Sequence, residues 1–291
     1  MSYIKKHPII MIIVGVFGIS LSSIFVKYSS APSSVTAMYR LLWTILLQSP
    51  VVFASRPLRT ELLGTKPKTT LLCSLSGLFL AIHFVLWFES LNHTSVASST
   101  TIVCTEVIWV SLGYCLLMKG HIPFKAIIAI IATLLGSMLI ALSQSSDKAH
   151  LYGVILALLA AIAVAVYMLI GRVVRTNTST TVYTYIVYSV CTLTLIIICI
   201  IQQINPFKYG ANPVFIGLLL AVFSTILGHS IFSWCLKYFS PSFVSASKLC
   251  EPVVAAILAA ILFAEIPHPV QLTGGALILG GVYYYSRLEN K

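Results

Sequence analysis

The chain has 291 residues, of which 58% are hydrophobic and only 9% are charged, and its formal net charge is +11 at pH 7. Soluble domains carry about 25% charged residues, so this composition excludes a soluble domain in practice. Nucleic-acid binding would need the cations on one soluble face, and so apolar a chain offers no such face. We therefore expect an all-α membrane protein.

Ten apolar stretches follow one another along the chain, each of about 20 residues and so long enough to cross a bilayer core. They lie at about 8–27, 33–54, 69–90, 94–117, 123–143, 151–170, 180–201, 213–236, 241–263 and 269–286. The first stretch has no cleavage site of small residues, so we expect a retained span rather than a signal peptide. The connections between the stretches are too short to hold a catalytic domain.

Lysine and arginine gather on every second connection. If the N-terminus is cytoplasmic, the inner segments hold Lys5, Lys6, Arg56, Arg59, Lys66, Lys68, Lys119, Lys125, Arg172, Arg175, Lys237, Arg287 and Lys291. The outer connections hold only Lys27, Lys148 and Lys208. Because cationic loops stay on the cytoplasmic side, this bias predicts that both termini lie in the cytoplasm. The expected location is the cytoplasmic (inner) membrane.

The second half of the chain repeats the first. A shift of 146 residues places His83 on His229 and Cys104 on Cys250, in register with the hydropathy. The chain thus divides into two five-helix repeats, 8–143 and 151–287. Because five is odd, the two copies must enter the membrane from opposite sides. Inverted repeats enclose a central cavity that can open alternately to either side, which predicts a transporter.

Short motifs occur in both halves of the chain. In the first half they are Phe25-Val26-Lys27, Tyr39-Arg40-Leu41-Leu42 and Thr94-Ser95-Val96-Ala97. In the second they are Leu236-Lys237-Tyr238, Glu251-Pro252-Val253, Ala264-Glu265 and the glycines from Gly274-Gly275 to Gly280-Gly281. With the ten spans, these marks make the chain similar to the drug/metabolite transporter superfamily, specifically its EamA-type ten-span transporters. The resemblance implies a metabolite or drug transporter, commonly an exporter.

The chain departs from the family pattern at two places. Glu106 stands in the fourth span where the ninth has Pro252, and Met118-Lys119-Gly120 stands where the family usually shows an acidic residue. The first departure makes the site of this copy chemically individual.

The ninth span carries two charges near its middle. Lys248 and Glu251 are three residues apart and therefore share a helix face, and Pro252 frees the carbonyl group of Lys248 from its helical bond. Charges in the middle of a span cost about 2.5–3.5 kcal/mol on insertion scales and usually mark function. Two interpretations remain open: a substrate site, or an ion pair within the helix beside a structural kink.

The fourth span carries Glu106 and a stripe of hydroxyl groups. Thr94, Ser98, Thr101 and Thr105 lie on one face of the predicted helix, and such residues also serve as ordinary packing groups. Glu106 must face a cavity, find a cation such as Arg40 or Lys248, or take up a proton. We expect it to be the residue that couples transport to protons.

The third and eighth spans carry His83 with Trp87 and His229 with Trp234. Their equivalent positions in the repeat predict that the two histidines lie at one central cavity. The spacing of acidic, histidine and cysteine residues does not suit a zinc site, and no cofactor is expected. Arg40 either binds substrate or anchors the second span to a carboxylate.

The fifth and tenth spans carry small residues four apart, Ala132 with Gly136 and Ala276 with Gly280. Such faces allow close approach of helices. They either hold the two halves together or form the contact of a homodimer, and the sequence leaves both open.

These observations favour a carrier of a small polar or zwitterionic metabolite, an amino acid or a related compound. The expected substrate-binding residues are Lys248, Glu251, Glu106, His83, Trp87, His229, Trp234 and Arg40. A multidrug exporter of lipophilic cations is the first alternative, and a lipid-handling or structural membrane protein is the second. An enzyme is the weakest interpretation, because the sequence has no nucleophile-elbow, phosphate-loop or metal motif.

Overall fold

The computed structural model describes residues 8–94, 96–144, 151–251, 253–254, 257 and 269–289. The first half contains α2 (Pro8–Ser20), α3 (Ser22–Lys27), α4 (Ser33–Ala54), α5 (Arg56–Leu63), α6 (Pro67–His93), α7 (Val96–Val103), α8 (Glu106–Met118) and α9 (Phe124–Gln144). The second half contains α10 (Leu151–Val174), α11 (Thr180–Ile201), η1 (Pro206–Tyr209), α12 (Asn212–Leu219), η2 (Leu220–Ser230), α13 (Ile231–Cys235), α14 (Pro241–Lys248) and α16 (Pro269–Glu289).

Seven helices of the described part are long and apolar enough to cross a membrane, by length and composition. They are Ile9–Lys27, Ser33–Ala54, Pro67–His93, Ser99–Met118, Leu151–Val174, Thr180–Ile201 and Asn212–Cys235, with Phe124–Leu139 as a shorter apolar helix. The expected all-helical, multi-pass membrane protein is thus confirmed. The count of ten spans stays a prediction, because the ninth, 241–263, lies partly outside the described residues. Lys5, Lys6, Ser95, Lys148, Pro252, Ala264, Glu265 and Lys291 also lie outside them.

Caps and prolines fix where several helices begin. The hydroxyl groups of Ser179 and Ser240 accept hydrogen bonds from the N–H groups of Val182 and Phe243, at the starts of α11 and α14. Proline stands in the first turn of α6, α12 and α14, where a backbone N–H has no helical partner to lose. These local signals explain why the predicted and observed starts of α11 and α14 agree to within one residue.

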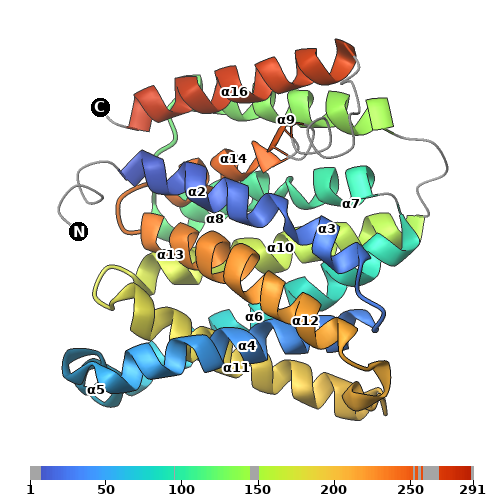
Figure 1. Ribbon diagram of the computed structural model, residues 1–291. Helices are drawn as coiled ribbons and strands as arrows, with labels where there is room; N and C mark the ends of the chain where they lie inside the picture. Colours follow the sequence, from blue (N-terminus) through green and yellow to red (C-terminus); the bar gives the residue numbers. More distant parts are fainter. Residues whose placement is uncertain are drawn as a thin grey trace.

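The two halves pack in a matched way. α6 packs against α10, and the equivalent elements of the repeat, η2 and α2, also pack together. In the same way, α6 packs against α11, and their equivalents α12 and α4 pack together. α4 with α11, α8 with α14 and α9 with α16 each pack against their own counterparts. A two-fold relation between the halves accounts for this pattern. Figure 1 shows α9 and α16 on one side of the bundle, α4 and α11 on the other, and the remaining spans between them.

The fourth span is broken into α7 and α8 at Cys104 and Thr105. Around the break, the N–H groups of Thr105 and Ile108 bond to carbonyl groups three residues earlier, at 3.0 and 2.9 Å. The Thr105 hydroxyl also donates to the carbonyl oxygen of Ile102 at 2.6 Å, and such side-chain bonds bend helices. The sequence does not predict this break, because neither proline nor glycine marks it.

The ninth span breaks at the equivalent place. α14 ends at Lys248, and the N–H groups of Leu249 and Cys250 again bond to carbonyl groups three residues earlier, at 3.1 and 3.2 Å. The distortion lies in the turn before Pro252, the turn in which the proline leaves the carbonyl group of Lys248 without its helical bond. Since the fourth span breaks without any proline, proline is not required for this geometry.

α9 and α16 approach closely through small residues. A Cβ atom on Gly136 would stand 2.5 Å from the carbonyl oxygen of Gly274, and one on Gly281 would stand 2.5 Å from Cγ2 of Thr133. The face at Gly136 therefore joins two helices of the same chain. Among the described atoms, none lies within 4 Å of the place where a Cβ on Gly280 would stand. The tenth span thus contacts the fifth through Gly274 and Gly281, and of the two roles left open for Gly280, holding the halves together is not seen among the described atoms.

Candidate functional site

A cavity of about 50 Å³ lies between the two halves of the chain. It is lined by Ile19, Ser22, Arg40, His83, Trp87, Thr100, Val103, Cys104, Glu106, His229, Lys248 and Glu251. Every predicted site residue except Trp234 is in this set. A cavity needs roughly 10–15 Å³ to hold one water molecule, so in this conformation there is room for a few waters only. A metabolite would need the two halves to move apart.

An ion pair joins the halves across this cavity. Nζ of Lys248, from the ninth span, lies 2.9 Å from Oε1 of Glu106, from the fourth, and both side chains are almost fully buried. The alternative of a Lys248–Glu251 pair within one helix is therefore wrong for this conformation. Lys248 is one of the two cations that the sequence offered as partners of Glu106, and the contact decides between them because residue spacing along one helix cannot show which helices face each other.

The helix breaks place these two charges at favourable positions. Glu106 is the first residue of α8, and Lys248 is the last residue of α14. The N-terminal end of a helix carries partial positive charge and the C-terminal end partial negative charge. Each buried charge is therefore stabilised by the end of its own helix as well as by its partner.

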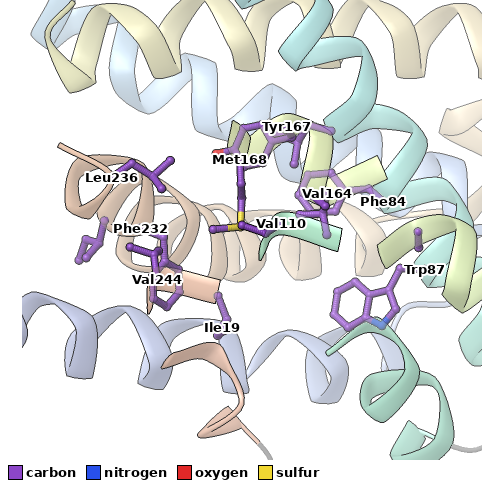
Figure 2. Close-up of a cluster of buried hydrophobic side chains, with 14 of the residues drawn as sticks. Ile19, Phe84, Trp87, Val110, Val164, Tyr167, Met168, Phe232, Leu236 and Val244 are labelled. Atoms are coloured by element: carbon purple, nitrogen blue, oxygen red, sulfur yellow. The ribbon is translucent and has the colours of Figure 1, made fainter. Parts of the chain in front are cut away.

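Apolar side chains surround the Lys248 end of the pair. Its ammonium group lies 3.5 Å from the sulfur of Met168 and 5.5 Å from the centre of the Phe232 ring. Figure 2 shows Met168 extending from α10 into a cluster that also contains Phe232, Val244 and Ile19. Removing this ammonium from water is costly, so its attraction to Glu106 must compensate.

Arg40 is fully buried, and no carboxylate oxygen of the described residues lies within 4.0 Å of its guanidinium. Its Nε donates to Oγ1 of Thr225 at 2.8 Å, its NH1 donates to Oγ of Ser22 at 3.1 Å, and its guanidinium lies 4.2 Å from the centre of the Phe84 ring. Its NH2 has no hydrogen-bond partner among the described residues. The expected anchoring of the second span therefore comes from hydroxyl groups and an aromatic ring, and one donor group remains unused.

The two histidines lie together, with ring centres 6.3 Å apart. Nδ1 of His83 is 3.0 Å from the carbonyl oxygen of Ala160, which can only accept, so Nδ1 carries the proton in this contact. The ring of Trp87 stacks on His83 at 6.0 Å between centres, and its Nε1 has no partner among the described residues. This cluster forms an aromatic wall with an unused N–H donor.

Trp234 lies elsewhere, although the sequence argument placed it beside His229. It packs on Tyr238, with ring centres 4.4 Å apart, and does not line the cavity. The eighth span is a π-helix from Leu220 to Ser230 and an α-helix after it. The change of winding alters which positions share a face, and it is not visible as a sequence period.

Three members of the predicted hydroxyl stripe, Thr94, Thr101 and Thr105, do not line the cavity, and the side chain of Ser98 lies outside the described part of the structure. Thr100 lines the cavity instead, and its Oγ1 has no partner among the described residues. The Thr105 hydroxyl donates to the carbonyl oxygen of Ile102 at the helix break. The predicted stripe assumed one continuous helix, but Thr94 caps the end of α6 and Thr105 lies in the break between α7 and α8. Ser22 and Thr100 are the polar lining residues that the sequence argument missed.

Comparison with known proteins supports this architecture. The chain is similar to a solved structure titled "Crystal structure of protein", with a TM-score of 0.78, 14% sequence identity, and coverage of 98% of each chain. At that identity the likeness shows the fold alone. No curated protein matches the sequence. The model of the EamA-like transporter family matches twice, over residues 7–142 and 151–287. Because these two matches take in nearly the whole sequence, the chain belongs to the EamA-like transporter family, as its motifs predict.

Proposed function

We propose that the protein is a secondary transporter that carries a small polar or zwitterionic metabolite across the cytoplasmic membrane. Members of its family are transporters rather than enzymes. The observation that carries the proposal is the meeting of charges from both halves at one cavity: Arg40 and Glu106 from the first, Lys248 and Glu251 from the second. Buried charges inside a membrane are costly, and a transport pathway is their usual reason.

Alternating access explains why these charges come from different halves. The Lys248–Glu106 pair bridges the fourth and ninth spans, which also pack against each other as α8 and α14. Rocking one half against the other would open the cavity to one side at a time. In this proposal, the ion pair holds the halves together when no substrate is bound.

Export of lipophilic cations is the first alternative. A site for cations would present carboxylates without competing positive charge, whereas Arg40 and Lys248 both line this cavity. Like charges repel strongly where the dielectric constant is low. The charge balance therefore favours a substrate that itself carries an anionic group.

Lipid handling is the second alternative, and one observation favours it. An apolar groove of about 440 Å³ lies between α2, α14 and α16. Its lining includes Val16, Phe243 and Leu279, and also Ser247 and Cys250, which neighbour Lys248 and Glu251 in the sequence. An acyl chain would suit such walls, so the test of function must also measure the movement of lipids.

The deciding experiment is an uptake screen with purified protein in liposomes. Metabolite mixtures are offered at equal pH and with an imposed pH gradient, and the retained compounds are identified by mass spectrometry against empty liposomes. We expect small polar or zwitterionic compounds to be enriched. Enrichment of lipophilic cations alone would favour the first alternative, and scrambling of a fluorescent phospholipid without metabolite uptake would favour the second.

For the coupling ion, we propose that a proton on Glu106 drives transport. Such a proton would remove the attraction between Glu106 and Lys248, 2.9 Å apart, and so weaken a contact between the two halves. Glu106→Gln keeps a hydrogen-bond acceptor for Lys248 but cannot titrate. We expect this variant to exchange substrate at equal pH and to lose accumulation driven by a pH gradient. Accumulation equal to that of the parent would exclude Glu106 as the coupling residue.

For the orientation, we propose that both termini face the cytoplasm. Figure 1 shows the start of α2, the end of α16 and the arginine-containing α5 at one end of the bundle, which suits the charge bias. A cysteine introduced at Lys208 should react with an impermeant reagent only from outside the cell. Reaction from the cytoplasmic side alone would reverse the orientation.

A further inference from the structure

The ion pair changes which charges of the cavity are left for a ligand. Lys248 and Glu106 neutralise each other. Among the described residues, no carboxylate oxygen lies within 4.0 Å of the Arg40 guanidinium, and no cationic nitrogen lies within that distance of the Glu251 carboxylate. One positive and one negative group therefore face the same cavity without ionic partners.

Of these two groups, the Arg40 guanidinium has the greater need of a counter-charge. Its side chain is completely buried, with hydroxyl groups on Nε and NH1 and an aromatic ring over its face, and its NH2 points to no acceptor. A buried cation without a counter-charge is strongly disfavoured, whereas guanidinium groups bind carboxylates well. The missing partner is thus an anionic group.

Two more donors line the cavity without partners in the described part of the chain, Nε1 of Trp87 and Oγ1 of Thr100. An indole N–H can only donate, so it also needs an acceptor. Together with NH2 of Arg40, these atoms suit the two oxygens of a carboxylate. Glu251, directly after the break in the ninth span, is the acceptor available for an ammonium group.

We propose that the cavity binds both charges of an amino-acid zwitterion, the carboxylate on Arg40 and the ammonium group on Glu251. The proposal rests on the transport function above and narrows its substrate class. The Lys248–Glu106 pair then acts between the two halves rather than as the substrate anchor, which the sequence argument placed on Lys248. The bound zwitterion brings no net charge into the membrane, because each of its charges meets the opposite one.

The test uses three ligands that differ only in charge. The 20 common L-amino acids are first ranked by the rise they cause in the unfolding midpoint of the purified full-length protein, since a ligand that binds the native state stabilises it. The best ligand is then compared with its decarboxylated amine and its deaminated acid. For leucine these are 3-methylbutylamine and 4-methylpentanoate. The parent should bind the amino acid about tenfold or more tightly than either analogue, because each analogue lacks one charge-assisted contact.

Each single substitution should then remove the preference for the amino acid over one of its two analogues. The amine should bind to Arg40→Met as tightly as the amino acid does. The acid should bind to Glu251→Gln as tightly as the amino acid does. Arg175→Met is the matched control, because Arg175 is also buried but donates to the backbone carbonyl groups of Ser233 and Thr178. It should keep the order of the parent. If Arg40→Met fails to fold, Arg40→Lys should keep the order with weaker binding.

The outcomes separate this inference from the proposed function. Equal binding of the amine or the acid to the parent would overturn it, as would an unchanged preference in both cavity variants. Uptake of polar metabolites by liposomes without binding of any amino acid would also overturn it and leave the transport function intact. Failure of both the uptake screen and the ligand ranking would reject the proposed function itself.

Discussion

The fourth and ninth spans share one backbone form, and each carries one member of the buried ion pair. Both are broken near the middle, with N–H groups bonded three residues back, and the breaks at 104–105 and 249–250 are 145 residues apart in the sequence. At the first break a helix begins with Glu106; at the second a helix ends with Lys248. The shared part of the repeat therefore supplies two helix ends that face one cavity.

The two halves share the backbone breaks but only some of the charged side chains at them. A helix that begins inside the membrane favours an anion at its first turn, and a helix that ends there favours a cation. Each break creates one place of each kind, and the halves fill them differently: Glu106 and Glu251 both stand directly after a break, whereas Lys248 ends α14 where Val103 ends α7. The repeat thus explains the geometry of the site, whereas Lys248 has no charged counterpart in the other half.

The largest expected effect comes from removing one member of the ion pair. Lys248→Ala leaves Glu106 buried without a counter-charge, which costs about 3–5 kcal/mol of stability for pairs of this kind. We expect the thermal unfolding midpoint of the purified protein to fall steeply. Adding Glu106→Ala should restore much of the loss, because no stranded charge then remains.

The matched control is Lys248→Ala with Glu251→Ala. If Lys248 and Glu106 are partners, this second double variant should stay as unstable as the single one. Rescue by Glu251→Ala and none by Glu106→Ala would show that the pair lies within the ninth span, contrary to the 2.9 Å contact observed between the halves.

An intermediate effect is expected where the fifth and tenth spans meet. Gly136→Ala would place a methyl group 2.5 Å from the carbonyl oxygen of Gly274, and overpacking of this kind costs about 1–3 kcal/mol. Gly280→Ala meets open space among the described atoms and should be neutral, or stabilising by up to about 1 kcal/mol through helix propensity. Unfolding midpoints measured side by side check this difference. Equal losses would mean that Gly280 is also covered, for example by a second copy of the chain.

The smallest effect should come from the side-chain bonds at the two breaks. Thr105→Val removes the bond to the carbonyl oxygen of Ile102, and Ser247→Ala removes the 2.8 Å bond to that of Phe243. Each should lower stability by about 0.5–1.5 kcal/mol, the net worth of one hydrogen bond. Similar small losses would support equivalent breaks. A loss from Thr105→Val as large as that from Lys248→Ala would show that the hydroxyl alone maintains the fourth-span break.

Local signals allowed much of the fold to be predicted. The spans expected at 33–54 and 180–201 match α4 and α11 residue for residue. Apolar runs, prolines and capping serines are properties of neighbouring residues, so they can be read along the chain. The breaks at Thr105 and at the end of α14 could not, because they depend on bonds that compete with a regular helix only once the neighbours are in place.

The sequence by itself determined the class of the protein, its repeat and the charged, histidine and tryptophan residues of the cavity, because a charge inside an apolar span needs a polar surrounding. Only the tertiary structure decided which charges are partners. Lys248 is three residues from Glu251 but pairs with Glu106 from the other half, and Arg40 is left with an unused donor. Helical spacing governs contacts along one helix, whereas a buried ion pair is decided by which helices pack face to face.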